Sequence, residues 1–91
     1  MNIEILIIGN EILIGKTQDT NSIWMAKRIT KFGHKLRRIT TIGDELEEIA
    51  SALRDILKQE PDVIITLSQR IIILFRKHSS PFPFQAFFII V

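Results

Sequence analysis

A run of β-branched apolar residues opens the chain and restricts its fold more than any other feature. From Ile3 to Ile8 every residue except Glu4 is apolar, and Gly9 ends the run. A strand that is apolar at nearly every position, instead of every second one, is typical of a parallel sheet covered on both faces. The chain is therefore expected to begin with a buried, central strand.

The first predicted helix begins near residue 20 and continues to about Phe32. Thr20, Asn21 or Ser22 can cap its amino end, because each side-chain oxygen can accept a hydrogen bond from a free backbone N–H group. Gly33 then follows as the residue that ends the helix. The apolar positions have the three- and four-residue spacing of one helix face: Met25, Ala26, Ile29 and Phe32.

The second predicted strand, from about Lys35 to Ile42, is more polar than the first. Such a strand suits the edge of a sheet, where side chains meet water. Arg37 and Arg38 form a basic strip beside Lys35, which we interpret as protection of that edge in preference to an RNA-binding surface.

The second predicted helix has the clearest period in the chain. Asp44 is expected to cap it, and Glu47 completes a capping-box arrangement. Pro61 and Asp62 end the segment, and the apolar run from Val63 to Leu67 predicts a third buried strand. The helix stripe consists of Leu46, Ile49, Ala50, Leu53, Ile56 and Leu57.

The order strand, helix, strand, helix, strand predicts an α/β fold with right-handed crossovers. We expect three layers, α/β/α, around a mainly parallel sheet in which the first strand lies between the second and the third. Residues 10–19 have no period, so they are expected to form a loop with a short strand or turn from Ile12 to Ile14. The βαβαβ stretch is the start of such a fold and is incomplete as a domain.

Residues 69–91 do not continue this design. They hold five of the six phenylalanines and two of the three prolines, and they contain three bases and no acid. Residues 1–68 and 69–91 are therefore treated as two segments: the start of a domain, and an atypical hydrophobic and basic tail. The sequence leaves open whether this tail adds a strand to the sheet. Its composition is that of aggregation-prone segments.

Composition excludes several classes of function. The chain has no cysteine, which excludes a disulfide framework, a zinc–thiolate site and a cysteine nucleophile, and which fits a cytoplasmic location. Residues 1–68 hold nine bases and ten acids, so this segment has no excess of positive charge to attract a nucleic acid. Nucleic-acid binding is therefore the least favoured of the functions considered. The apolar runs are too short for a targeting signal or a membrane span.

Ligands of open parallel sheets bind beyond the carboxyl ends of the strands. Here those ends are Gly9–Glu11, Gly43–Asp44 and Ser68. Glycine lets the backbone approach a ligand closely. Glu11, Asp19 and Asp44 could together hold a divalent cation against a phosphate. The alternative is that these acids are solvated loop residues and that Asp44 serves as a helix cap.

Three segments resemble one known family. Gly9–Lys16 followed by Asp19–Ser22 resembles the G-x-E-[IL]-L-x-G…[DN]-T-N opening of the molybdopterin-binding-like (MoaB/MogA-type) domain, in the version of the competence/damage-inducible CinA group. Thr40–Asp44 is similar to its T-x-[VI]-G-D segment, and Asp62–Ser68 to its D-x-[VI]-[IL]-x-[TS] strand. The resemblance covers residues 3–68.

The resemblance implies a small phosphorylated ligand. Members of the family bind molybdopterin in cofactor biosynthesis, and CinA-type members hydrolyse the pyrophosphate of ADP-ribose-like nucleotides with a divalent metal such as Mg²⁺. Of this chain's acids, Glu11 and Asp44 would hold that metal. By resemblance the ligand-binding residues are Gly9, Asn10, Glu11, Gly15, Asp19, Asn21, Gly43, Asp44 and Ser68.

The family then continues with a glycine-rich phosphate loop, G-G-[LT]-G-P-T-x-x-D, which nothing after Ser68 resembles. We therefore expect a truncated domain that is inactive alone, since the backbone N–H groups of that loop would stabilise the phosphate. A change of reading frame after Ser68 would explain the break. The alternative function is a non-catalytic interaction or oligomerisation module, with the tail docked on a partner or in a homo-oligomer.

Overall fold

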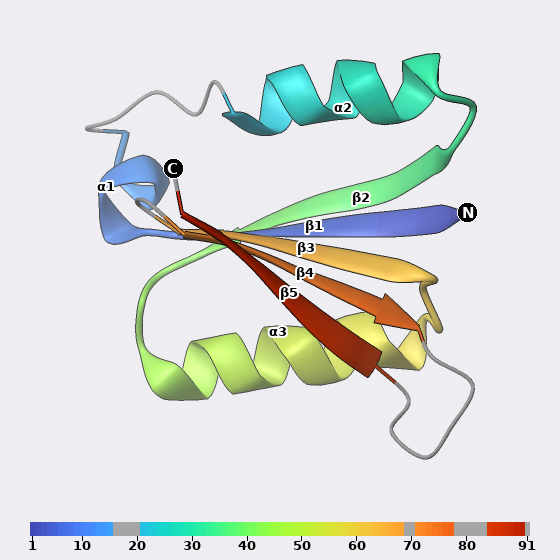
Figure 1. The fold of residues 1–91 in the computed structure, drawn as a ribbon. Helices are drawn as coiled ribbons and strands as arrows, with labels where there is room; N and C mark the ends of the chain where they lie inside the picture. Colours follow the sequence, from blue (N-terminus) through green and yellow to red (C-terminus); the bar gives the residue numbers. More distant parts are fainter. Residues whose placement is uncertain (16–20, 69–70, 78–83, 91) are drawn as a thin grey trace.

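A computed structural model of the chain describes residues 1–15, 21–68, 71–77 and 84–90. It has an α/β fold with a five-stranded sheet in the order β2-β1-β3-β4-β5 (Figure 1). The α/β class predicted from the sequence is confirmed. In chain order the elements are β1 (Asn2–Ile8), α1 (Asn10–Leu13), α2 (Asn21–Lys31), β2 (Lys35–Ile42), α3 (Leu46–Lys58), β3 (Val63–Ser68), β4 (Ile71–Lys77) and β5 (Phe84–Ile90).

The three strands of residues 1–68 are parallel and arranged as predicted. β1 lies between β2 and β3, and it pairs in parallel with both. β2 is at one edge of the sheet, in agreement with its polar sequence. These parallel strands place all three carboxyl ends on the same side of the molecule, next to α1 (Figure 1).

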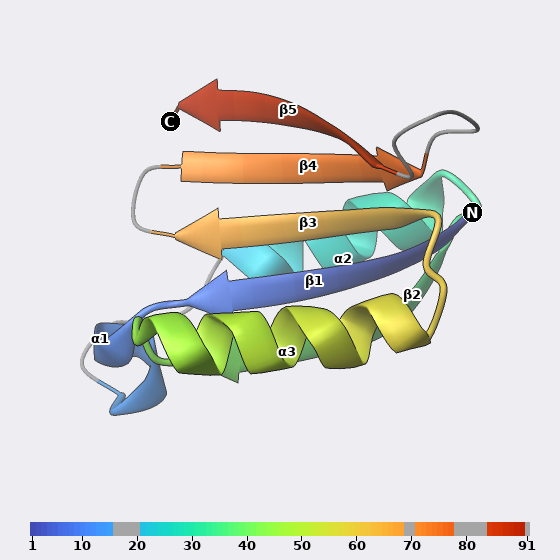
Figure 2. The ribbon, with the colours of Figure 1, turned by 90° about the horizontal axis from the view of Figure 1, so that it is seen from below.

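Helices α2 and α3 cover opposite faces of the sheet, which gives the three predicted layers (Figures 1 and 2). Because successive side chains of a strand point to opposite faces, β1 contributes to both cores. Ile5 and its neighbours pack with Ile29 of α2, while Leu6 packs with Ile56 of α3. Ile5, Leu6 and Ile56 are almost completely buried. None of the described helices has the length and apolar character needed to cross a bilayer.

The tail adds two antiparallel strands to the sheet. β4 pairs with β3 and β5 pairs with β4, so the sheet is mixed and is parallel in its first three strands alone. Thr66 donates a side-chain hydrogen bond to the carbonyl of Ile73, 3.2 Å away. The free edge of β3 therefore gives the apolar β-formers of the tail a backbone to pair with. The frame change after Ser68 stays a prediction.

Two local predictions are wrong. Of the short strand or turn expected from Ile12 to Ile14, the strand is wrong: helix α1 extends to Leu13, and a turn follows at Ile14 and Gly15. The capping box is also absent, because the residue before α3 is Glu45, which makes no side-chain cap bond. Asp44 lies one residue too early in the chain to cap α3, and it accepts a hydrogen bond from another loop.

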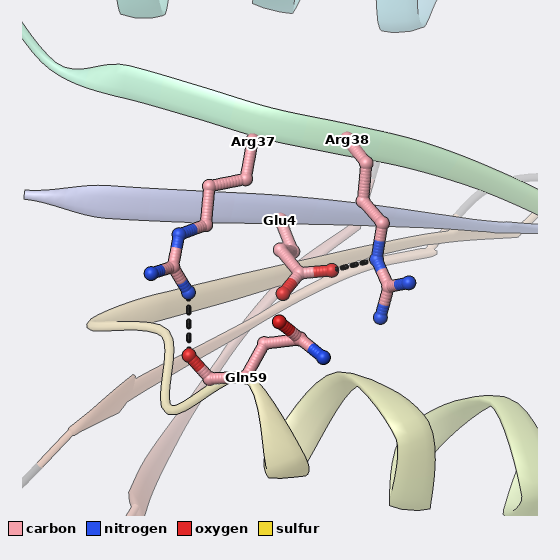
Figure 3. Close-up of polar contacts among 4 residues, drawn as sticks. All are labelled: Glu4, Arg37, Arg38 and Gln59. Carbon is pink, nitrogen blue, oxygen red and sulfur yellow. Dashed lines mark hydrogen bonds and ion pairs between the residues drawn. The ribbon is translucent and has the colours of Figure 1, made fainter.

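A buried ion pair joins β1 to the edge strand (Figure 3). The Arg38 Nε donates to the Oε1 of Glu4, whose side chain is 1% exposed. The pairing of β1 with β2 shifts register next to Glu4, so that Arg37 is the extra residue of a bulge. Arg37 and Arg38 consequently both extend toward α3, where Arg37 donates to the carbonyl of Gln59.

Candidate functional site

The carboxyl ends of β1 and β2 are held together beyond their last paired residues. The Gly9 N–H donates to the carbonyl of Ile42 at 3.0 Å, which extends the contact between the two strands into the loops. Ser68 ends β3 on the same side of the sheet and is exposed. A backbone hydrogen bond therefore joins two of the three strand ends at which the sequence predicts ligand binding.

A side-chain hydrogen bond joins the first predicted loop to the second. The Asn10 Nδ2 donates to the Oδ1 of Asp44 at 2.7 Å, although the two residues are 34 positions apart. Both residues are exposed, so this bond faces the solvent side of the loops. A ligand at this edge would meet an amide and a carboxylate that already orient each other.

Gly43 occupies a position that no larger residue fits without displacement. A Cβ atom there would lie 2.6 Å from the Oδ1 of Asn10 and 2.9 Å from the Oε2 of Glu48. The Gly43 N–H donates to that same Glu48 oxygen at 3.1 Å. Glu48 was missed by the sequence analysis. Its place in the first turn of α3, five residues after Gly43, is the signal that could have identified it.

The carboxylate of Glu11 folds back over Gly9. A Cβ atom on Gly9 would lie 2.8 Å from the Oε1 of Glu11, and Glu11 is partly buried. This contact places the acid of the G-x-E segment directly beside the carboxyl end of β1. The first loop therefore presents Glu11 and Asn10 from one turn of helix, α1.

The remaining predicted site residues are placed only in part. Gly15 has a φ of +80°, a conformation that favours glycine, and it is exposed in the turn after α1. Asn21 is the first residue of α2, but its side chain falls outside the described part of the structure, as does all of Asp19. The structure thus brings Asn10 and Asp44 together, and it brings Glu11 to Gly9.

The predicted magnesium site, with Glu11 and Asp44 as its ligands, stays a prediction. Within residues 1–15, 21–68, 71–77 and 84–90 no group of three or more acidic, histidine or cysteine side chains gathers at a metal-binding distance. One Asp44 oxygen already accepts a hydrogen bond from the side-chain amide of Asn10. A cation that binds this oxygen would have to compete with that hydrogen bond. The predicted third carboxylate, Asp19, lies outside the described residues.

A groove of about 450 Å³ leads away from these loops between β2 and α3. Its walls include Ile42 and Glu48, the two residues that accept hydrogen bonds from Gly9 and Gly43. The groove is therefore continuous with the loop site on its α3 side. The side chains of Thr40, Ser51 and Asp55 give it further hydrogen-bonding groups.

The side chains at the carboxyl ends of β1 and β2 are mainly hydrogen-bond acceptors. Glu11, Asp44 and Glu48 contribute carboxylates, and a carboxylate accepts hydrogen bonds while repelling a phosphate. The described part therefore suits the N–H and O–H groups of a ligand better than its anionic end.

Comparison with known proteins finds one matching family and several related sequences. Residues 4–68 match a family model described as a probable molybdopterin binding domain. A relative from Metallosphaera sedula is 52% identical over 62 residues, and one from Pyrococcus abyssi is 45% identical over 65 residues. These matches cover 68% and 71% of this chain but 23% and 26% of the relatives. The chain thus spans about a quarter of the length of these curated relatives.

A solved structure is similar to most of this chain. The crystal structure of CinA, a protein of unknown function from Thermoplasma acidophilum, is 34% identical in sequence and superposes with a TM-score of 0.65. The match covers 71% of this chain and 38% of that one.

Proposed function

The chain belongs to the family of probable molybdopterin-binding domains, and from this premise we propose that its loops 9–11 and 43–44 bind a small phosphorylated ligand. Molybdopterin and ADP-ribose-like nucleotides are the two ligand classes that the sequence resemblance implies. Both carry a donor-rich portion, a pterin ring or a ribose, in addition to phosphate.

The hydrogen bond between Asn10 and Asp44 is the observation that supports this proposal most strongly. It links the two motif segments that the resemblance assigns to the ligand, and it does so at the carboxyl edge of parallel strands. Preorganised polar groups bind a ligand with a smaller entropy cost than mobile ones. Conformational freedom that the loops have already lost in folding is not lost again on binding.

We assign the donor-rich portion of the ligand to this edge. The carboxylates of Glu11 and Asp44 would accept from pterin N–H or ribose O–H groups, and the groove beside α3 would accommodate the ring. The phosphate would depend on the glycine-rich loop, which residues 69–91 do not supply. The proposal is therefore binding without hydrolysis by this 91-residue chain.

Thermal unfolding in the presence of ligand tests this proposal. ADP-ribose and a pterin phosphate, each with and without Mg²⁺, are added to the purified chain. A ligand at about 100 times its Kd should stabilise the fold by about 2.7 kcal/mol. Asp44→Ala should weaken binding at least about tenfold, which corresponds to roughly 1.4 kcal/mol.

Glu60→Gln is the control for charge, because Glu60 is an exposed acid that follows the carboxyl end of α3 and is not one of the residues that line the groove. An equal loss of affinity in both variants would show that the ligand responds to overall charge and not to the loop site. Absence of any shift with either ligand would refute the proposal. Release of AMP from ADP-ribose would contradict the proposal that this chain binds its ligand without hydrolysing it.

A second candidate function is a non-catalytic interaction or oligomerisation module. The observation in its favour is that β5, Phe84–Ile90, occupies the other edge of the sheet and contains no charged residue. Edge strands without charges pair readily with further strands. A chain that associates through this edge at high salt, and that gains no stability from either ligand, would favour this function.

A further inference from the structure

The two helical layers of the molecule carry opposite charge. α2 contains Lys27, Arg28 and Lys31 and no acid, whereas residues 44–60 contain six acids and two bases. These two segments lie on opposite faces of the sheet (Figure 1). The layer formed by α2 is therefore cationic, and the layer formed by residues 44–60 is anionic.

The cationic layer also exposes large apolar side chains. Trp24 is 57% exposed and the Cζ of Arg28 lies 4.8 Å from its ring centroid, a cation–π contact. The inner side of the helix is occupied by Ser22 and Ile29, which are buried. Tryptophan and arginine are the residues most enriched at the centres of protein interfaces. We call the outward set the α2 patch: Ile23, Trp24, Lys27, Arg28, Lys31 and Phe32.

The cations of the α2 patch have no anionic partner among the described residues. The ion pair found in that part of the chain joins Arg38 to Glu4, on the other face of the sheet. Single exposed apolar residues are common on protein surfaces. A group of three exposed apolar residues, two of them aromatic, beside three cations is typical of a binding surface.

The anionic layer has a patch of complementary composition. Leu46, at the start of α3, is 80% exposed, and Glu45 and Glu47 flank it. In the described ranges neither glutamate forms an ion pair. Glu48 is not included, because it accepts from Gly43. We call Glu45, Leu46 and Glu47 the α3 patch.

We propose that the α2 patch of one copy of this chain binds the α3 patch of a second copy. Leu46 packs against the ring of Trp24, and the two glutamates pair with Lys27 and Lys31. Each patch has an apolar centre beside charged residues, which are cations in the α2 patch and anions in the α3 patch. The contact therefore buries apolar surface and brings opposite charges together. This inference concerns association and goes beyond the proposed ligand binding.

The position of the patches decides the symmetry of the assembly. Because they lie on opposite faces of the sheet, a copy that uses its α2 patch toward one neighbour keeps its α3 patch free for another. Such a head-to-tail contact closes into a ring or continues as a chain, and it does not stop at a two-fold dimer. Species larger than a dimer are therefore expected as the concentration rises.

Charge-reversal variants of the whole chain test this contact by sedimentation velocity. Lys27→Glu/Lys31→Glu and Glu45→Lys/Glu47→Lys should each sediment as monomers, since each places like charges on both patches. An equimolar mixture of the two variants should associate again, because each then meets a complementary neighbour. Lys58→Glu, which changes a cation outside both patches, should associate like the unmodified chain.

Salt provides a test that needs no variant. Association through these patches should weaken at least about tenfold as salt rises from low to high ionic strength, since exposed ion pairs are screened. A monomer at every concentration would overturn the proposal. An assembly that persists in high salt and is unchanged in both double variants would also overturn it, because the tail would then mediate the association. A monomer that instead binds a single-stranded oligonucleotide or anionic vesicles through Lys27 and Lys31 would overturn it as well.

Discussion

Replacement of Arg38 by methionine should destabilise the fold through the carboxylate that it leaves behind. Glu4 has a side chain that is 1% exposed, its Oε1 is bound by Arg38, and its Oε2 has no partner among the described residues. Removal of one partner of a fully buried pair costs about 3–5 kcal/mol. The Arg38 side chain is 44% exposed, so water can enter in its place, and we expect about 2–3 kcal/mol for Arg38→Met.

The converse replacement should cost much less. Glu4→Met removes the buried charge and fills a similar volume, while the half-exposed guanidinium of Arg38 can be hydrated. We expect a loss of about 0–1 kcal/mol for this variant. The double variant should be more stable than Arg38→Met alone, because no buried charge remains in it. This asymmetry distinguishes an ion pair with one buried member from an ordinary surface pair.

Urea unfolding followed by far-ultraviolet circular dichroism measures these differences. For a chain of this size, Arg38→Met should lower the Tm by roughly 10–20 °C. Arg37→Met is the control, because Arg37 makes an exposed bond to the Gln59 carbonyl, and its loss should cost less than about 1 kcal/mol. The reasoning is refuted if Glu4→Met costs as much as Arg38→Met, or if the two effects simply add in the double variant.

Three further predictions concern single positions. Ile56→Ala should lower the free energy of unfolding by about 2–5 kcal/mol, whereas Leu46→Ala should change it by less than about 0.5 kcal/mol, because Ile56 is 1% and Leu46 80% exposed; denaturant midpoints compare them. Gly33→Ala should cost about 1–2 kcal/mol in the same assay, since its φ is +81° and no atom obstructs a Cβ; no loss would contradict this. Gly43→Ala should weaken ligand binding more than stability, because its Cβ would displace Asn10; calorimetric titration together with the unfolding curve separates the two effects.

Local patterns were sufficient to predict most elements of residues 1–68. The second strand was predicted from Lys35 to Ile42 and has those bounds, and the first helix ends within one residue of its predicted end. Gly33 has the positive φ expected of a residue that ends a helix. These features depend on residues that are close in the sequence and on which face of an element is buried. The order of apolar and polar residues determines both.

The candidate site was predictable by residue type but not by partner. Gly9, Glu11 and Gly43 were identified from their position after strands, and the structure places them there. Asp44, however, bonds to Asn10 across 34 positions instead of capping α3. A capping signal is local, whereas the choice between two acceptors depends on which loop lies nearby in space.

Tertiary structure alone decided the remaining features. The bulge at Arg37 directs two successive arginines toward α3 and leads one of them to the buried Glu4, which the apolar run of β1 gave no reason to expect. The sequence left open whether the tail adds a strand to the sheet. In the structure it does, because β4 pairs with β3. Composition states how readily a segment forms strands, but the unpaired backbone groups that it meets determine where it pairs.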